Sequence, residues 1–187
     1  MFTLVIGGAA SGKSEYAENH VQKLPGSRIY VATMQPFDAE CRARIQRHRV
    51  PRAGKGFETL ECYTGDALSR VPAGANVLLE CMSNLVANDM YGPGGHGAHG
   101  ALRGAERLLS RCRHLTIVTN EVFSGGAQYA GGTLSYLRGL AQVNRVLAAR
   151  ADGGAALTSP PAPAALQRLG ATVHAINTDY CGTDINV

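Results

Sequence analysis

Eight residues near the start of the chain, Gly7–Ser14 (GGAASGKS), match the spacing G-x-x-x-x-G-K-[ST]. Glycines allow the backbone to curl so that successive N–H groups point at phosphate oxygens. An ammonium such as that of Lys13 can reach the outer phosphates, and a hydroxyl such as that of Ser14 can ligate Mg²⁺. The segment therefore predicts the binding of a nucleoside triphosphate, either ATP or GTP, rather than a glycine-rich turn that binds nothing.

Two glutamates follow short apolar segments that read as buried strands. Residues 76–79 (NVLL) precede Glu80, and residues 114–119 (HLTIVT) precede Asn120 and Glu121. In a parallel sheet both glutamates would open onto the crevice beside the phosphate loop. A carboxylate at such a place holds Mg²⁺ directly or through water, so we predict Glu80 and Ser14 as metal ligands. For Glu121, a structural cap is an equally open interpretation.

A third candidate group is the basic segment 38–49 (DAECRARIQRHR), which reads as a helix. Arg44 and His48 are four positions apart and so share a helix face. Neighbouring positive charge disfavours the imidazolium form of His48. A neutral imidazole is a nucleophile, and the arginines beside it can hold a phosphate oxyanion. From composition alone, a solvated basic helix with an incidental histidine remains an alternative.

The remaining pattern supplies the elements that position these groups. We expect strands at 2–6, 28–33, 57–62, 76–79 and 114–119, with weaker ones at 153–157 and 172–176. Helices are expected at 13–24, 38–49, 64–70, 81–90, 101–113 and 131–150. Segment 91–100, with His96 and His99, is expected to be a flexible glycine-rich connection rather than a metal pair. The order predicts an α/β fold, with a mostly parallel central sheet and helices on both faces.

Composition limits the class of protein. The chain has 187 residues, 45% of them hydrophobic, and a formal net charge of +4, which fits one globular domain spanning 1–187. Five cysteines without a C-x-x-C pair predict free thiols in a reducing cytosol and argue against a zinc site. Neither a long basic run for nucleic acid nor an apolar run for a membrane span is present, so we expect a cytoplasmic protein.

The order of several motifs resembles a known family. The motifs are LVIGGAASGKSEYAE, IYVAT, ARIQRHRVPR, ETLEC, VLLECMSNLVAND, VTNEV and VNRVLAARAD. From Met1 to about Leu157 the chain is similar to the bifunctional adenosylcobinamide kinase/adenosylcobinamide-phosphate guanylyltransferase of cobalamin (vitamin B12) biosynthesis. The resemblance implies a RecA-like P-loop NTPase domain, often a homotrimer, and leaves 157–187 as an atypical C-terminal extension.

The resemblance also implies two reactions. One phosphorylates the aminopropanol hydroxyl of adenosylcobinamide with a nucleoside triphosphate, and the other transfers GMP from GTP onto that phosphate through a guanylylated histidine. Carried over by position, that histidine is His48, which acts with Lys13 as a catalytic residue. The implied nucleotide contacts are Gly7, Gly8, Ala9, Ala10, Ser11, Gly12, Lys13, Ser14, Ala32, Thr33, Met34, Arg49, Val50, Pro51, Arg52, Glu61 and Glu80.

The C-terminal half departs from the family's pattern at several positions. Phe123 stands where the family usually has glycine, and Leu137-Arg138 stands where an Arg-Asp pair is expected. Two other functions therefore stay open. One is a different small-molecule P-loop kinase that uses only the phosphate loop and Glu80. The other is a non-catalytic GTP-binding homologue.

Overall fold

The computed structural model describes residues 1–8, 11–52, 54–121, 131–157 and 172–173. Ala9, Ala10 and Phe123 lie outside the described residues, as does most of the 157–187 extension. The side chains of Arg44, His48, Pro51 and residues 154–157 are also outside the description.

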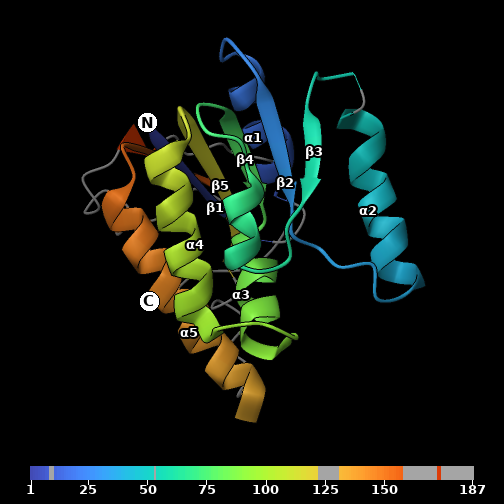
Figure 1. The fold of residues 1–187 in the computed structure, drawn as a ribbon, viewed down its shortest axis with the longest axis vertical. Coiled ribbons are helices and arrows are strands. Elements are labelled where there is room, and N and C mark those ends of the chain that lie inside the picture. Colours follow the sequence, from blue (N-terminus) through green and yellow to red (C-terminus); the bar gives the residue numbers. More distant parts are fainter. Residues whose placement is uncertain (9–10, 53, 122–130, 158–171, 174–187) are drawn as a thin grey trace.

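Within the described residues, one parallel sheet forms the centre of the molecule (Figure 1). Its seven strands lie in the order β3-β2-β4-β5-β1-β6-β7, and every neighbouring pair is parallel. The mostly parallel α/β sheet predicted from the sequence is therefore confirmed. The strands are β1 (Phe2–Gly7), β2 (Arg28–Ala32), β3 (Glu58–Glu61), β4 (Asn76–Glu80), β5 (His114–Asn120), β6 (Gly153–Leu157) and β7 (Thr172–Val173).

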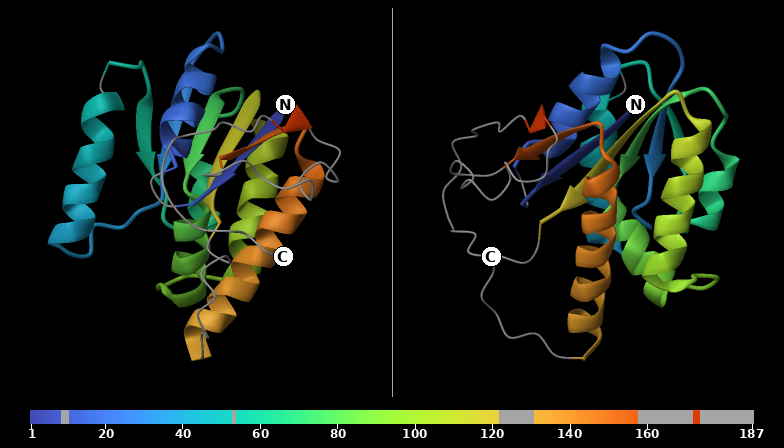
Figure 2. Two further views of the ribbon diagram at one scale, coloured as in Figure 1. Left: turned by 180° about the vertical axis from the view of Figure 1, so that it is seen from behind. Right: turned by 90° about the vertical axis from the view of Figure 1, so that its left-hand side faces the viewer.

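Helices cover both faces of the sheet, as predicted. α3, α4 and α5 form a layer on one face, and α1 packs on the other (Figures 1 and 2). α2 stands apart from the layer of α3, α4 and α5, beyond the edge strand β3 (Figures 1 and 2). The bounds are α1 (Lys13–Gln22), α2 (Ala39–Arg52), a 3₁₀ helix η1 (Asp66–Arg70), α3 (Met82–Tyr91), α4 (Gly97–Arg111) and α5 (Gly131–Arg150).

The four strands β1, β2, β4 and β5 are mostly apolar because both faces of the sheet are buried there. On β1, Leu4 packs with the three-helix layer whereas Val5 packs with α1. The same alternation places Val77 of β4 on one side and Leu78 on the other. Among the described residues, no helix combines the length and apolar character needed to cross a bilayer. The four described cysteines are free thiols.

Two predicted helix boundaries are wrong by three residues or more. α4 begins at Gly97, so residues 97–100 of the expected flexible connection are helical. Tertiary contacts stabilise this start, because the His96 backbone N–H donates to Asp89 Oδ1 over 3.3 Å. α2 continues to Arg52 instead of ending at Arg49. Pro51 lies in the last turn and removes only one backbone N–H donor from the helix. The loss of that one hydrogen bond does not end the helix here.

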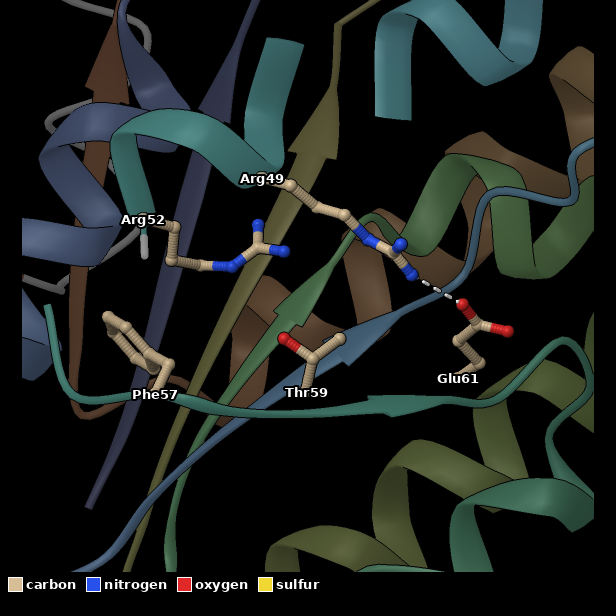
Figure 3. A pocket seen from close by; sticks show the side chains of 5 residues that line it. All are labelled: Arg49, Arg52, Phe57, Thr59 and Glu61. Carbon is tan, nitrogen blue, oxygen red and sulfur yellow. Dashed lines mark hydrogen bonds and ion pairs between the residues drawn. The ribbon is translucent and has the colours of Figure 1, made fainter. Parts of the chain in front are cut away.

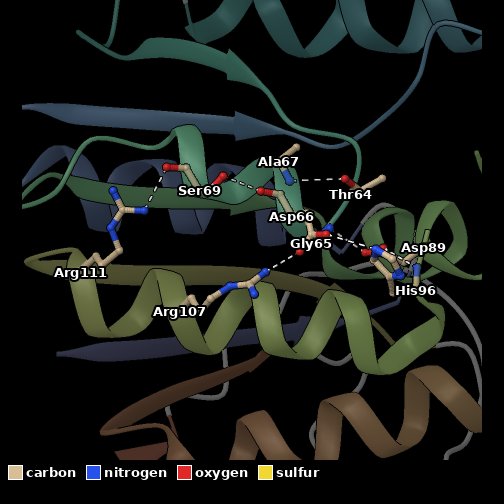
Figure 4. Close-up of polar contacts among 9 residues, drawn as sticks. All are labelled: Thr64, Gly65, Asp66, Ala67, Ser69, Asp89, His96, Arg107 and Arg111. Carbon is tan, nitrogen blue, oxygen red and sulfur yellow. Dashed lines mark hydrogen bonds and ion pairs between the residues drawn. The ribbon is translucent and has the colours of Figure 1, made fainter. Parts of the chain in front are cut away.

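Glycines bring α4 against the segment before η1 (Figure 4). A Cβ added to Gly104 would lie 2.4 Å from the carbonyl oxygen of Gly65, and one added to Gly65 would lie 2.2 Å from that of Gly100. The buried carboxylate of Asp89 accepts a hydrogen bond from the Gly65 N–H at 2.7 Å. These contacts join α3, η1 and α4 into one unit.

Substituting Gly104 with alanine tests this close approach. Helix propensity alone favours alanine, but the added methyl would overlap backbone, so we expect Gly104→Ala to lower the free energy of unfolding by about 1–3 kcal/mol. The measurement is urea unfolding. Gly132→Ala in α5 is the matched control, because its Cβ would lie 3.7 Å from the nearest atom and its stability should not fall. Equal stability of Gly104→Ala and the unaltered chain would contradict the contact.

Candidate active site

The carboxyl ends of β2, β3, β4 and β5, together with the loop that follows β1, border one cleft with a volume of about 800 Å³. The cleft lies where open parallel sheets place their ligands, because loops diverge from the strand ends at that edge. Its lining residues are Ser11, Gly12, Lys13, Ser14, Glu15, Glu18, Tyr30, Ala32, Met34, Ile45, Arg47, Arg49, Arg52, Lys55, Glu61, Glu80, Cys81, Asn84, Asn120 and Glu121.

The predicted phosphate loop connects the end of β1 to the start of α1. Gly12 precedes the helix with a φ of 77°, a left-handed conformation that glycine adopts without steric cost. The Lys13 ammonium is mostly buried and donates to the carbonyl oxygen of Gly8 over 2.7 Å. The loop thus places a cation and the N-terminus of α1 together at the cleft, an arrangement suited to an anion.

Glu80, at the end of β4, meets the first turn of α1. The Ser14 hydroxyl donates to Glu80 Oε1, while the buried Oε2 has no hydrogen-bond partner among the described residues. Burial raises the pKa of the Glu80 carboxyl above its ordinary value, and the Ser14 hydrogen bond and the Lys13 ammonium oppose that rise. A carboxylate and a hydroxyl are hard oxygen donors, so these two side chains suit a Mg²⁺ ion.

The C-terminal end of α2 forms another wall of the cleft. Arg49 donates to Glu61 Oε1 at 2.8 Å, and Tyr63 donates to the other oxygen of Glu61 at 2.7 Å. A smaller cavity of about 340 Å³ adjoins this wall and is lined by Arg49, Arg52, Phe57, Thr59 and Glu61 (Figure 3). The edge strand β3 and the end of α2 therefore enclose a recess beside the main cleft.

Arg52 is held by an aromatic ring. The residue is only 5% exposed, and its guanidinium carbon lies 3.4 Å from the centre of the Tyr30 ring. A cation over the face of an aromatic ring is attracted by the ring's quadrupole. The buried Nη1 atom of Arg52 has no hydrogen-bond partner within the described part of the chain. Arg52 therefore presents a desolvated cation to the cleft.

Most of the described residues predicted to contact the nucleotide meet at this cleft. The lining includes Ser11, Gly12, Lys13, Ser14, Ala32, Met34, Arg49, Arg52, Glu61 and Glu80. Thr33 lies elsewhere: it is fully buried, and its hydroxyl bonds the backbone N–H and C=O of Cys81. Val50 is 64% exposed, and neither it nor Gly7 or Gly8 is among the lining residues. Ala9, Ala10 and the side chains of His48 and Pro51 lie outside the described residues.

Several lining residues were not singled out by the sequence. Tyr30 lies inside a strand and Glu18 inside a helix, where no local pattern distinguishes a cleft residue from a core residue. Asn84 lies in the first turn of α3, four residues after Glu80, so it was within reach of the same reasoning. Glu121 does border the cleft beside Asn120, at the end of β5.

Comparisons with known proteins point to one family. The family model described as cobinamide kinase / cobinamide phosphate guanyltransferase matches residues 3–159. The bifunctional adenosylcobalamin biosynthesis protein CobU of Salmonella typhimurium is 34% identical over 170 residues, covering 81% of this chain and 92% of that protein. The protein of the same name from Escherichia coli is 32% identical over 169 residues, with the same coverage of 81% and 92%. The chain therefore belongs to the cobinamide kinase / cobinamide phosphate guanyltransferase family.

Proposed function

We propose that this chain performs two reactions in the one cleft, the phosphorylation of adenosylcobinamide and the transfer of GMP from GTP to adenosylcobinamide phosphate. Family membership supports the two activities. The observation that carries their assignment to this cleft is the meeting of Lys13, Ser14 and Glu80 with the basic end of α2. The first group suits a triphosphate, and the second suits a nucleophile that attacks phosphorus.

For phosphoryl transfer, positioning and charge stabilisation supply the catalysis. The Lys13 ammonium and the loop N–H groups hold the outer phosphate oxygens. The hydroxyl of the corrinoid side chain forms a bond to the γ-phosphorus and releases its proton to water, while the bond from that phosphorus to the bridging oxygen breaks and the nucleoside diphosphate leaves. Ser14 and Glu80 would hold Mg²⁺, which would neutralise charge on the outer phosphates. The buried Oε2 of Glu80, which has no partner among the described residues, supports this ligand role.

For guanylyl transfer, the nucleophile is His48, which belongs to α2 and precedes Arg52 by one helical turn. A ring nitrogen of His48 forms a bond to the α-phosphorus of GTP, and the bond from that phosphorus to the bridging oxygen breaks as pyrophosphate leaves. A phosphate oxygen of adenosylcobinamide phosphate then attacks the same phosphorus and releases the imidazole. Arg47 and Arg49 line the cleft and stabilise charge on the α-phosphate oxygens.

The other expectations from the resemblance stay predictions. These are the homotrimer, the cytoplasmic location, the choice between ATP and GTP as phosphate donor, and the single domain with an atypical extension over 157–187. The extension lies almost wholly outside the described residues, as does Phe123, one of the departures from the family's pattern.

Removal of the Lys13 ammonium tests the phosphate loop. We expect Lys13→Ala to lower turnover of the triphosphate by about 100-fold or more, because charge on the outer phosphates then has no cationic partner at this position. The measurement is the rate of phosphate transfer to adenosylcobinamide. Lys23→Ala is the matched control, since Lys23 follows the far end of α1 and is exposed. Full activity of Lys13→Ala would mean that the loop binds no triphosphate.

The role of Glu80 is tested by an uncharged side chain of the same shape. We expect Glu80→Gln to raise the Mg²⁺ concentration needed for half-maximal activity by about 10- to 100-fold without lowering the unfolding midpoint. Glu58→Gln is the control, because Glu58 is exposed at the start of β3. An unchanged Mg²⁺ requirement in folded Glu80→Gln would assign Glu80 a structural role.

The decisive experiment for the proposed function separates the two reactions. We expect His48→Asn to abolish the attachment of GMP to the protein and to spare phosphorylation of adenosylcobinamide, because only guanylyl transfer needs the imidazole. The mass of the protein after exposure to GTP measures the adduct. His99→Asn, at an exposed position on α4, is the control.

Three outcomes of that experiment point elsewhere. An equal adduct on the unaltered chain and on His48→Asn would move the nucleophile to another residue. Phosphorylation without any adduct would favour a kinase alone. Binding of GTP with neither reaction would favour a non-catalytic homologue.

A further inference from the structure

The helix that carries the proposed nucleophile is held to the rest of the site by a few polar contacts at its C-terminal end. Arg49 pairs with Glu61, but both side chains are 49% exposed, and exposed ion pairs contribute little to holding a helix in place. The stack of Arg52 on Tyr30 is buried and holds the last residue of α2 against β2. A further contact, between Lys55 and Glu18, lies just beyond the helix.

The Lys55–Glu18 ion pair is largely removed from solvent. The Lys55 ammonium lies 2.7 Å from Glu18 Oε2, and the exposed fractions of the two side chains are 19% and 6%. Asn19 offers a second acceptor at 3.5 Å. An ion pair in such surroundings is weakly screened and has a preferred geometry, unlike a solvated surface pair. Its attraction therefore fixes the separation of the two segments that carry it.

The two partners come from the two segments that must meet in guanylyl transfer. Glu18 lies on α1 one turn after Ser14, so it shares the face of the helix that follows the phosphate loop. The backbone N–H of Lys55 donates to the carbonyl of Arg52 at 2.9 Å, which links Lys55 directly to the last residue of α2. The pair thus joins the phosphate-loop helix to the end of the helix that contains position 48.

We propose that Glu18 and Lys55 are positioning residues for guanylyl transfer, whose ion pair sets the placement of α2, and with it His48, relative to the phosphate loop. The proposal rests on the proposed function, because it assigns His48 the role of nucleophile. Neither residue touches the reacting atoms in this role. Phosphorylation of adenosylcobinamide depends on Lys13, Ser14 and Glu80 and needs no such placement of α2.

A double-mutant cycle tests the pair. The variants are Glu18→Leu, Lys55→Ala and the two together, and the last leaves no unpaired buried charge if a single variant folds poorly. We expect each single change to lower the rate of GMP attachment at saturating GTP by about tenfold or more, because small displacements of reacting groups are costly. The double variant should match the singles within about twofold, because either change removes the same contact.

Two further readouts separate positioning from direct binding. The GTP concentration for half-maximal attachment should change by less than about threefold, and phosphorylation by the same preparation should fall by less than about threefold. Lys55→Arg, which keeps a cation in reach of Glu18, should restore most of the attachment rate. The control is Glu106→Gln with Arg150→Met, which removes an ion pair between α4 and α5.

The results that would overturn the proposal are distinct. Slow attachment in Lys55→Ala but not in Glu18→Leu would show that Lys55 contacts the nucleotide itself. Equal losses of attachment and phosphorylation would show a general defect of the fold. Attachment that is insensitive to both changes would overturn the positioning role alone, whereas absence of a GMP adduct at His48 in the unaltered chain would overturn the proposed function and this inference with it.

Discussion

The hydrogen bond from Ser14 to the carboxylate of Glu80 connects the two halves of the site. Ser14 belongs to the first turn of α1, and Glu80 ends β4, which is separated from β1 by β5. A carboxylate removed from water is stable only when donors or cations surround it. Because Glu80 is such a group, the position of the phosphate loop and that of β4 constrain each other, and the strand ends between them border the cleft.

α2 is held in place by a different kind of interaction from the other helices. Its sequence, AECRARIQRHRVPR, has no continuous apolar stripe, so hydrophobic burial cannot hold it on the sheet. Its described attachments are an exposed ion pair, a cation over the Tyr30 ring and the Lys55–Glu18 pair beyond its end. This kind of attachment keeps arginines at the wall of the cleft, where an apolar helix would present none.

The opposite face of the molecule is built by close packing. The glycines at positions 65 and 104 let backbone approach backbone, so that α4 and the segment before η1 lie nearer than side chains would allow. Asp89 satisfies a backbone N–H at that contact and another at the start of α4. The residues that look like a flexible connection in sequence therefore begin a helix, because its neighbours order them.

The amino-acid sequence by itself determined the elements and the phosphate loop. Strands buried on both faces and a complete G-x-x-x-x-G-K-S pattern are local signals, and they placed Lys13, Ser14 and Glu80 at one edge of a parallel sheet. The choice among the functions left open came from the order of motifs along the chain, which family membership then supported.

Only the tertiary structure decided which side chains meet. Tyr30 and Arg52, like Glu18 and Lys55, are separated in sequence and carry no shared pattern, yet they form the contacts that hold the end of α2. The burial of Thr33, its bonds to Cys81 and the exposure of Val50 were equally out of reach of the sequence. The physical reason is that periodicity and turn residues report the conformation of neighbouring residues, whereas desolvated charge pairs depend on how the helices pack on the finished sheet.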